Sequence, residues 1–230
     1  MFSLCLHCLG NLCWPQAAES NLKRVSLELG GKSPLIICAD ADLKAAAAAA
    51  ASASWFNVGQ NCIAASRIYV EETVYDEFVG MMVQKAKERL VGDPLDRRTE
   101  HGPMNNKPHF ERVMKYINQC VAEGGKLLFG GKRWGQTGYY IEPAVFADLT
   151  DAMTISREET FGPICQLYKF KKGDIAGVIK RANNSEYGLC SGVFTSNMST
   201  AMNVADAMKA GTCFINDYNK VPVARRGYFG

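Results

Sequence analysis

The sequence lacks the features that mark several specialised classes of protein. No apolar run approaches the roughly 20 residues that a membrane-spanning helix needs. No dense block of Lys or Arg occurs, and the formal net charge of +3 is too small to indicate binding to nucleic acid or to an anionic membrane. We therefore expect neither a membrane protein nor a nucleic-acid-binding protein.

Side chains suited to a metal site or a disulfide framework are scarce or poorly spaced. Cys5 and Cys8 form one C-x-x-C pair, but no second pair and no pair of His residues follows, whereas a closed zinc site needs four ligands. The nine cysteines are odd in number and scattered. We predict no metal site and reduced thiols, as in an intracellular protein. The expected location is cytoplasmic, with mitochondrial as the alternative.

A glycine-rich turn that could hold phosphate groups is also missing. No G-x-G-x-x-G motif follows a strand-like segment, and the glycine pairs at 30–31 and 130–131 are too bare to replace one. The sequence is therefore not expected to contain a complete dinucleotide-binding unit.

Hydrophobic residues make up 47% of the 230 residues, which is ample for a sizeable core. From Val25 onward, short β-like runs alternate with helical patterns, which predicts an α/β fold with a mainly parallel sheet and crossover helices. The first 14 residues are expected to form an irregular terminus. The predicted strands are 25–29, 35–38, 67–70, 126–129, 139–146, 164–170, 192–195 and 212–216. The predicted helices are one that is capped by Asp40 or Asp42 and ends near 57–59, and those at about 73–90, 108–122, 175–182 and 200–209.

Cys62 lies in the most informative segment, residues 59–67 (Gly-Gln-Asn-Cys-Ile-Ala-Ala-Ser-Arg). This segment places one thiol in a loop between a helix and a strand, where its side chain can face a cleft. A thiol suits nucleophilic catalysis because it is intrinsically nucleophilic and partly ionised at neutral pH. The alternative is a small buried hydrophobic residue, which is the commoner role for a cysteine taken alone.

Glu28 is the second candidate for a catalytic role. It lies at the end of an apolar strand-like run, just before Gly30 and Gly31, where backbones can approach each other closely. A partly buried carboxylate at such a strand end suits a general base. A solvent-facing residue on the polar side of the strand is the equally weighted alternative.

Three segments together resemble the signature segments of the aldehyde dehydrogenase superfamily, in the family's order and at its approximate spacing. They are residues 27–34 (Leu-Glu-Leu-Gly-Gly-Lys-Ser-Pro), 56–62 (Phe-Asn-Val-Gly-Gln-Asn-Cys) and 158–163 (Glu-Glu-Thr-Phe-Gly-Pro). The resemblance covers roughly residues 17–224. Residues 61–65, 92–96, 101–103 and 216–220 look most like the C-terminal dehydrogenase domain of the 10-formyltetrahydrofolate dehydrogenases.

The resemblance implies a reaction and a role for five residues. The Cys62 thiolate would add to an aldehyde to give a thiohemiacetal, hydride would leave for NAD or NADP, and Glu28 would activate the water that hydrolyses the resulting thioester. Glu159 would bond the nicotinamide ribose, Phe161 would pack near the ring, and Gly30 would belong to the cofactor-binding residues. The implied substrate is a small-molecule aldehyde, with the formyl group of 10-formyltetrahydrofolate as one candidate.

By the same resemblance, the chain is expected to be truncated at both ends. Residues 1–16 are unassigned, 17–31 are a remnant of the cofactor-binding domain, 32–224 are the catalytic domain, and 225–230 form a divergent end. Family members form homo-oligomers, and the missing oligomerisation segment argues against one here. Two alternatives stay open: an inactive remnant that binds a full-length relative, and a thiol esterase that needs no cofactor.

Overall fold

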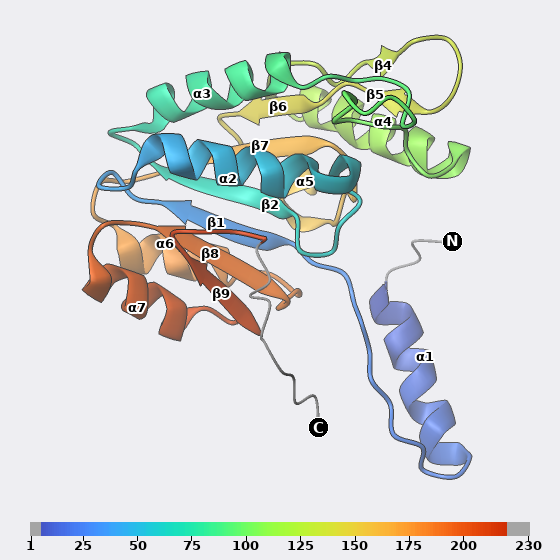
Figure 1. The fold of residues 1–230 in the computed structure, drawn as a ribbon. Coiled ribbons are helices and arrows are strands. Elements are labelled where there is room, and N and C mark those ends of the chain that lie inside the picture. Colours follow the sequence, from blue (N-terminus) through green and yellow to red (C-terminus); the bar gives the residue numbers. More distant parts are fainter. Residues whose placement is uncertain (1–5, 220–230) are drawn as a thin grey trace.

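The computed structural model of the protein describes residues 6–219, with side chains from residue 11 onward. Seven strands form one sheet in the order β3-β6-β7-β2-β1-β8-β9. Every neighbouring pair is parallel except β3 with β6, which confirms the predicted α/β fold (Figure 1). The strands are β1 (Ser33–Ile37), β2 (Ala65–Glu71), β3 (Lys126–Phe129), β6 (Ala144–Ala147), β7 (Ile164–Phe170), β8 (Cys190–Phe194) and β9 (Thr212–Ile215).

Helices cover both faces of the sheet, as a parallel sheet requires. One face carries α2 (Leu43–Trp55) and α3 (Tyr75–Glu88). The opposite face carries α4 (Lys107–Ala122), α5 (Thr154–Arg157), α6 (Ile175–Ala182) and α7 (Met198–Ala207). Every residue of β1, an interior strand of the sheet, is buried, because side chains on both of its faces are covered.

Helix α2 shows how the local sequence sets one of these elements. The Asp42 carboxylate accepts hydrogen bonds from the backbone N–H groups of Lys44 and Ala45, at 3.0 and 3.1 Å, so Asp42 is the cap. Asp40 instead accepts a hydrogen bond from the Thr195 hydroxyl at 2.8 Å, just beyond the end of β8. The alanine run supplies the buried face of α2, and these small side chains let the helix lie close to the sheet.

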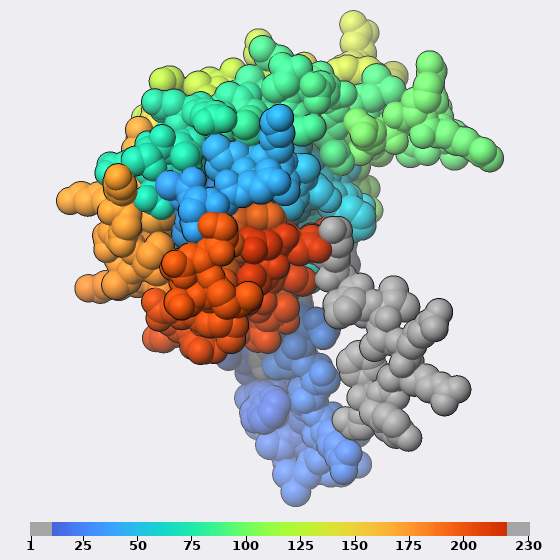
Figure 2. Space-filling model, turned by 60° about the vertical axis from the view of Figure 1, so that its left-hand side comes forward, coloured from blue at the N-terminus to red at the C-terminus, as the bar shows by residue number. Residues whose placement is uncertain are grey.

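The N-terminal part of the chain differs from the expectation. Residues 6–19 form helix α1 (Leu6–Glu19) rather than an irregular terminus, and its Leu12 and Trp14 are exposed. Residues 22–32 belong to no strand, so the strand predicted at 25–29 is wrong. A strand forms only when a neighbour accepts and donates its backbone hydrogen bonds, and no described strand pairs with this segment. Figures 1 and 2 show α1 projecting away from the α/β body.

The strand predicted at 139–146 is broken into two short strands. β5 (Tyr140–Ile141) pairs with β4 (Arg133–Trp134) in a separate two-stranded sheet, whereas β6 belongs to the main sheet. Pro143 lies between them, and its lack of an N–H group interrupts the strand. The divergent end expected at 225–230 lies outside the described residues.

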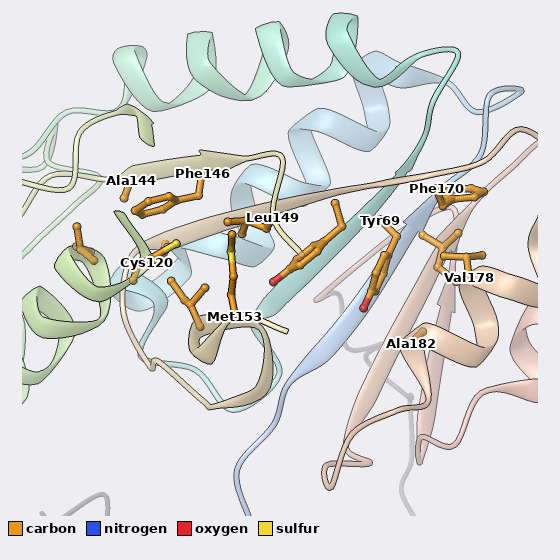
Figure 3. Packing of buried hydrophobic residues seen from close by; sticks show 14 of the residues in the cluster. Tyr69, Cys120, Ala144, Phe146, Leu149, Met153, Phe170, Val178 and Ala182 are labelled. Atoms are coloured by element: carbon orange, nitrogen blue, oxygen red, sulfur yellow. The ribbon is translucent and has the colours of Figure 1, made fainter. Parts of the chain in front are cut away.

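A continuous apolar core joins the two halves of the sheet on the α4 side. Figure 3 shows its side chains reaching from Ala144 and Phe146 at one end to Val178 and Ala182 at the other. The rings of Tyr69 on β2 and Tyr168 on β7 lie 5.1 Å apart within this core. The strands therefore pack as one unit, which holds the positions where they begin.

Met82 and Met202 offer a matched test of this packing. Met82 on α3 is fully buried, whereas Met202 on α7 is 46% exposed. We expect Met82→Ala to lower the free energy of unfolding by about 2–5 kcal/mol, because it leaves a cavity in the core. Met202→Ala should change it by less than about 0.5 kcal/mol. Urea unfolding of both variants measures the difference, and equal losses would contradict the packing described here.

Candidate active site

The three segments that carry the family resemblance meet at one edge of the sheet. Residues 28–32 lead into β1, Cys62 lies just before β2, and residues 159–163 lead into β7. These strands are adjacent in the order β7-β2-β1 and run parallel. Parallel neighbours begin at the same edge, so segments that are distant in the sequence are brought side by side.

Glycines allow these segments to touch backbone to backbone. A Cβ atom placed on Gly31 would overlap the carbonyl oxygen of Cys62, and one on Gly59 would overlap the carbonyl oxygen of Gly162. A Cβ on Gly30 would overlap the carboxylate of Glu159. The contacts therefore join all three segments, and each one depends on a missing side chain.

The loop before Cys62 has an uncommon backbone. Asn57 and Val58 have φ angles of 49° and 60°, and the following Gly59 has a φ of 69°. The Asn57 side chain donates to the Gln60 carbonyl at 2.9 Å, and the Gln60 side chain accepts from the Asn105 N–H at 2.9 Å. These bonds hold a left-handed turn that brings the chain around to Cys62.

Cys62 is a half-buried thiol at the centre of this arrangement. Partial burial raises its pKa most, and the negative charges of Glu159 and Glu28 raise it further. The backbone N–H groups of Cys62 and Ile63 act in the opposite direction, because they stabilise a thiolate. The electrostatic interaction with both carboxylates means that Cys62 shares their surroundings.

Cys38 and Cys165 lie in a different environment. Both are buried, and burial raises the pKa of each thiol to about 12. A thiol in that state is almost entirely protonated at neutral pH and is a poor nucleophile. Cys62 is therefore better placed for chemistry than either of them.

Glu28 lies in the unpaired segment before β1, and its side chain is exposed. The partial burial that we expected for the Glu28 carboxylate is therefore wrong. The charge of Glu28 raises the pKa of the Cys62 thiol, and its exposed carboxylate is open to water.

Glu159 and Phe161 lie in the segment that leads into β7. The Glu159 carboxylate is half-buried and accepts a hydrogen bond from the Gly31 N–H at 3.1 Å. Burial raises its pKa, and the Gly31 N–H, Lys32 and Arg112 act against that rise. Phe161 has a φ of 51°, and its carbonyl is bonded to His109 at 2.7 Å.

Two hollows border these residues. A small one is lined by residues that include Glu159, Phe161 and Asn61, the neighbour of Cys62 in the chain. A larger cavity of about 930 Å³ opens on the other side of Glu159 and is lined mainly by polar and charged side chains. Gly30 and Glu159 line this larger cavity, so it adjoins the candidate site.

Lys32 is a buried charged residue to which the sequence analysis gave no role. Only 1% of its surface is exposed, and its Nζ donates to the Gln166 side-chain oxygen at 3.2 Å. Burial and then the charge of Arg67 lower the pKa of Lys32. Its position between two glycines and β1 was the available signal, because a lysine in an apolar strand entry needs a partner.

Within residues 6–219, no helix has the length and hydropathy needed to cross a bilayer. Among residues 11–219, whose side chains the structure describes, no group of three or more His, Cys, Asp or Glu is placed to hold a metal ion.

Known proteins are similar to this chain in both sequence and fold. The sequence model of the aldehyde dehydrogenase family matches residues 11–230. The chain belongs to the aldehyde dehydrogenase family. It is 50% identical over 216 residues to the cytosolic 10-formyltetrahydrofolate dehydrogenase of Xenopus laevis, covering 94% of this chain and 24% of that protein. It is 51% identical over 211 residues to human retinal dehydrogenase 2, covering 92% of this chain and 40% of that protein.

Solved aldehyde dehydrogenases have the same fold. The NAD+ complex of aldehyde dehydrogenase from Bacillus cereus superposes with a TM-score of 0.88 at 45% identity, covering 93% of this chain and 43% of that one. This aldehyde dehydrogenase family chain therefore spans about a quarter of the length of its formyltetrahydrofolate dehydrogenase relatives and less than half of the others.

Gly31 and Gly80 provide a test of the close contact at the site. Gly31→Ala should destabilise the protein by about 1–3 kcal/mol, because its Cβ would overlap the Cys62 carbonyl. Gly80 lies within α3 with open space around it, so Gly80→Ala should stabilise the protein by up to about 1 kcal/mol. Thermal unfolding of both variants measures the change in stability. The reaction rate of Cys62 with iodoacetamide in each variant measures whether the change reaches the thiol. An unchanged rate and stability in Gly31→Ala would show that the two backbones are not in contact.

Proposed function

We propose that the protein oxidises an aldehyde to the acid with NAD or NADP as acceptor, using Cys62 as nucleophile and Glu28 as the base that activates water. The observation that carries this proposal is the meeting of the three segments at the adjacent starts of β1, β2 and β7. The electrostatic interactions of Glu28 and Glu159 with the half-buried Cys62 thiol support the roles proposed for these residues.

The first step uses the Cys62 thiolate. It adds to the aldehyde carbon, and the resulting oxyanion needs hydrogen-bond donors such as the backbone N–H of Cys62. Loss of hydride from this thiohemiacetal leaves a thioester on Cys62. The covalent intermediate divides one difficult oxidation into two easier steps.

The second step uses Glu28. Its exposed carboxylate can accept a proton from a water molecule while that water attacks the thioester carbonyl. Hydrolysis releases the acid and returns the thiol. The electrostatic interaction between Glu28 and Cys62 supports a position close enough for this role.

Glu159, Phe161 and Gly30 are the residues proposed to hold the cofactor, which supplies the hydride acceptor when bound. The Glu159 carboxylate fits a ribose as a hydrogen-bond acceptor. It borders a cavity and can accept hydrogen bonds from two neighbouring hydroxyls. Gly30 leaves that carboxylate uncovered, since any larger residue would occupy its place. Phe161 is only partly buried, and its aromatic ring can pack against a planar group.

The substrate is proposed only as a class, namely small aldehydes. The formyl group of 10-formyltetrahydrofolate is one candidate, because the relatives that share about half of their residues with this chain include 10-formyltetrahydrofolate dehydrogenases. Human retinal dehydrogenase 2 is equally similar, so overall identity does not favour one aldehyde.

Calorimetry with NAD+ and NADP+ tests the cofactor assignment. Glu159→Gln should weaken binding about tenfold or more, because it removes a charged acceptor of hydrogen bonds. Glu111, an exposed carboxylate of α4 that pairs with Lys107 and does not line the cavity, supplies the control. Glu111→Gln should leave the affinity unchanged. Absence of binding by the unaltered chain would refute the cofactor part of the proposal.

Turnover of p-nitrophenyl acetate tests the two catalytic residues without cofactor. Cys62→Ala should abolish turnover, whereas Cys213→Ala, at a half-buried thiol of β9, should retain it. Glu28→Gln should still release one equivalent of p-nitrophenol but then stall, because the acetyl thioester is no longer hydrolysed. Mass spectrometry would detect the acetyl group on Cys62. Full turnover by Cys62→Ala would eliminate it as the nucleophile.

A further inference from the structure

We propose that His109 is a positioning residue that holds Phe161 in its left-handed backbone conformation and so fixes the wall of the small hollow that Phe161 shares with Asn61, the neighbour of Cys62 in the chain. This inference rests on the proposed function, in which Phe161 helps to hold the cofactor. It concerns a contact between α4 and the segment before β7, and it can be tested without cofactor.

Phe161 has a backbone conformation that an aromatic residue rarely adopts. Its φ of 51° lies in the left-handed region, where the Cβ of a bulky side chain is crowded. The next residue is Gly162, which would tolerate such a conformation far better. The surrounding structure must therefore hold Phe161 in place.

The direct hold is a hydrogen bond between the His109 ring and the Phe161 carbonyl. His109 Nε2 lies 2.7 Å from that oxygen, and because a carbonyl only accepts, Nε2 carries the proton. Nδ1 is then the acceptor, and it faces a guanidinium N–H of Arg112. Burial, followed by the Arg112 charge, lowers the pKa of His109, so the imidazole is neutral at pH 7 with one tautomer selected by its partners.

His109 is itself held firmly by the helix that carries it. The Asn106 side chain caps α4 and accepts the His109 backbone N–H at 2.9 Å. The His109 ring also packs against the Phe161 ring, with centroids 5.9 Å apart and planes inclined by 60°. The imidazole therefore contacts both the backbone and the side chain of Phe161.

The segment around Phe161 is enclosed on two sides, so a movement of Phe161 would be felt by its neighbours. Val113, one turn further along α4, fills the space beside Gly162, while Gly59 lies against the Gly162 carbonyl from the other side. Phe161, Gly59 and Asn61, the last being the neighbour of Cys62 in the chain, line the same small hollow. A shift of the Phe161 peptide would therefore change the walls of that hollow.

Hydrogen exchange by mass spectrometry, without cofactor, tests the proposal. His109→Ala should speed exchange of the peptide spanning residues 158–164 by about five- to tenfold, the change expected from losing one buried hydrogen bond. His109→Gln should restore slow exchange, because its amide N–H can donate to the same carbonyl. An unaltered exchange rate in His109→Ala, or fast exchange in His109→Gln as well, would overturn the proposal.

His101 is the matched control. It is also buried, and its Nε2 lies 2.9 Å from a backbone carbonyl, that of Ile141. His101→Ala should leave exchange at 158–164 unchanged while speeding exchange near residue 141. Equal acceleration at 158–164 in both His variants would mean general loosening and would refute a specific hold.

A double variant separates positioning from simple loss of stability. Phe161→Gly removes the crowding that needs to be held, so His109→Ala should accelerate exchange much less in that background than in the unaltered chain. Equal acceleration in both backgrounds would contradict the proposal. If exchange behaves as expected but the chain binds neither NAD+ nor NADP+, the proposed function fails while the His109–Phe161 contact stands.

Discussion

The parallel pairing of β2 with β1 on one side and with β7 on the other is the constraint on which the candidate site depends. Each of these strands begins at the same edge, so the segment entering each strand is delivered to the same place. The residues that follow in the strands are almost all buried and leave no alternative register. A shift of one strand would move its entry segment and separate Cys62 from Glu159.

Close backbone contact is the second requirement, and it explains why glycine stands at several positions of the site. Gly30, Gly31 and Gly59 each occupy a place where a methyl group would overlap an atom of another segment. The contacts bring the Cys62 carbonyl and the Glu159 carboxylate within reach of the chain that carries Glu28. The proposed chemistry thus depends on absent side chains as much as on Cys62 itself.

The charges around the site have opposing effects on the ionisation of Glu159 and Cys62. Lys32 and Arg112 favour the ionised form of Glu159, whereas burial disfavours it. The two carboxylates disfavour a Cys62 thiolate, and the backbone N–H groups near the sulfur favour it. Burial has the largest effect on both groups and disfavours the ionised form of each, so a bound substrate or cofactor that changes the local charge can shift the thiol toward its reactive form.

The sequence by itself determined the class of fold, most of the strands and helices, and the family, because these follow from local periodicity and from short motifs. It also singled out Cys62, Glu28, Gly30, Glu159 and Phe161 through those motifs, whose roles here are proposals. The tertiary structure decided that 25–29 pairs with no strand among residues 6–219 and that Pro143 separates β5 from β6. It also revealed that Lys32 is buried, and it revealed the His109–Phe161 contact, which no local pattern indicates. Such features arise from strands and helices that are distant in sequence, and only packing sets their distances.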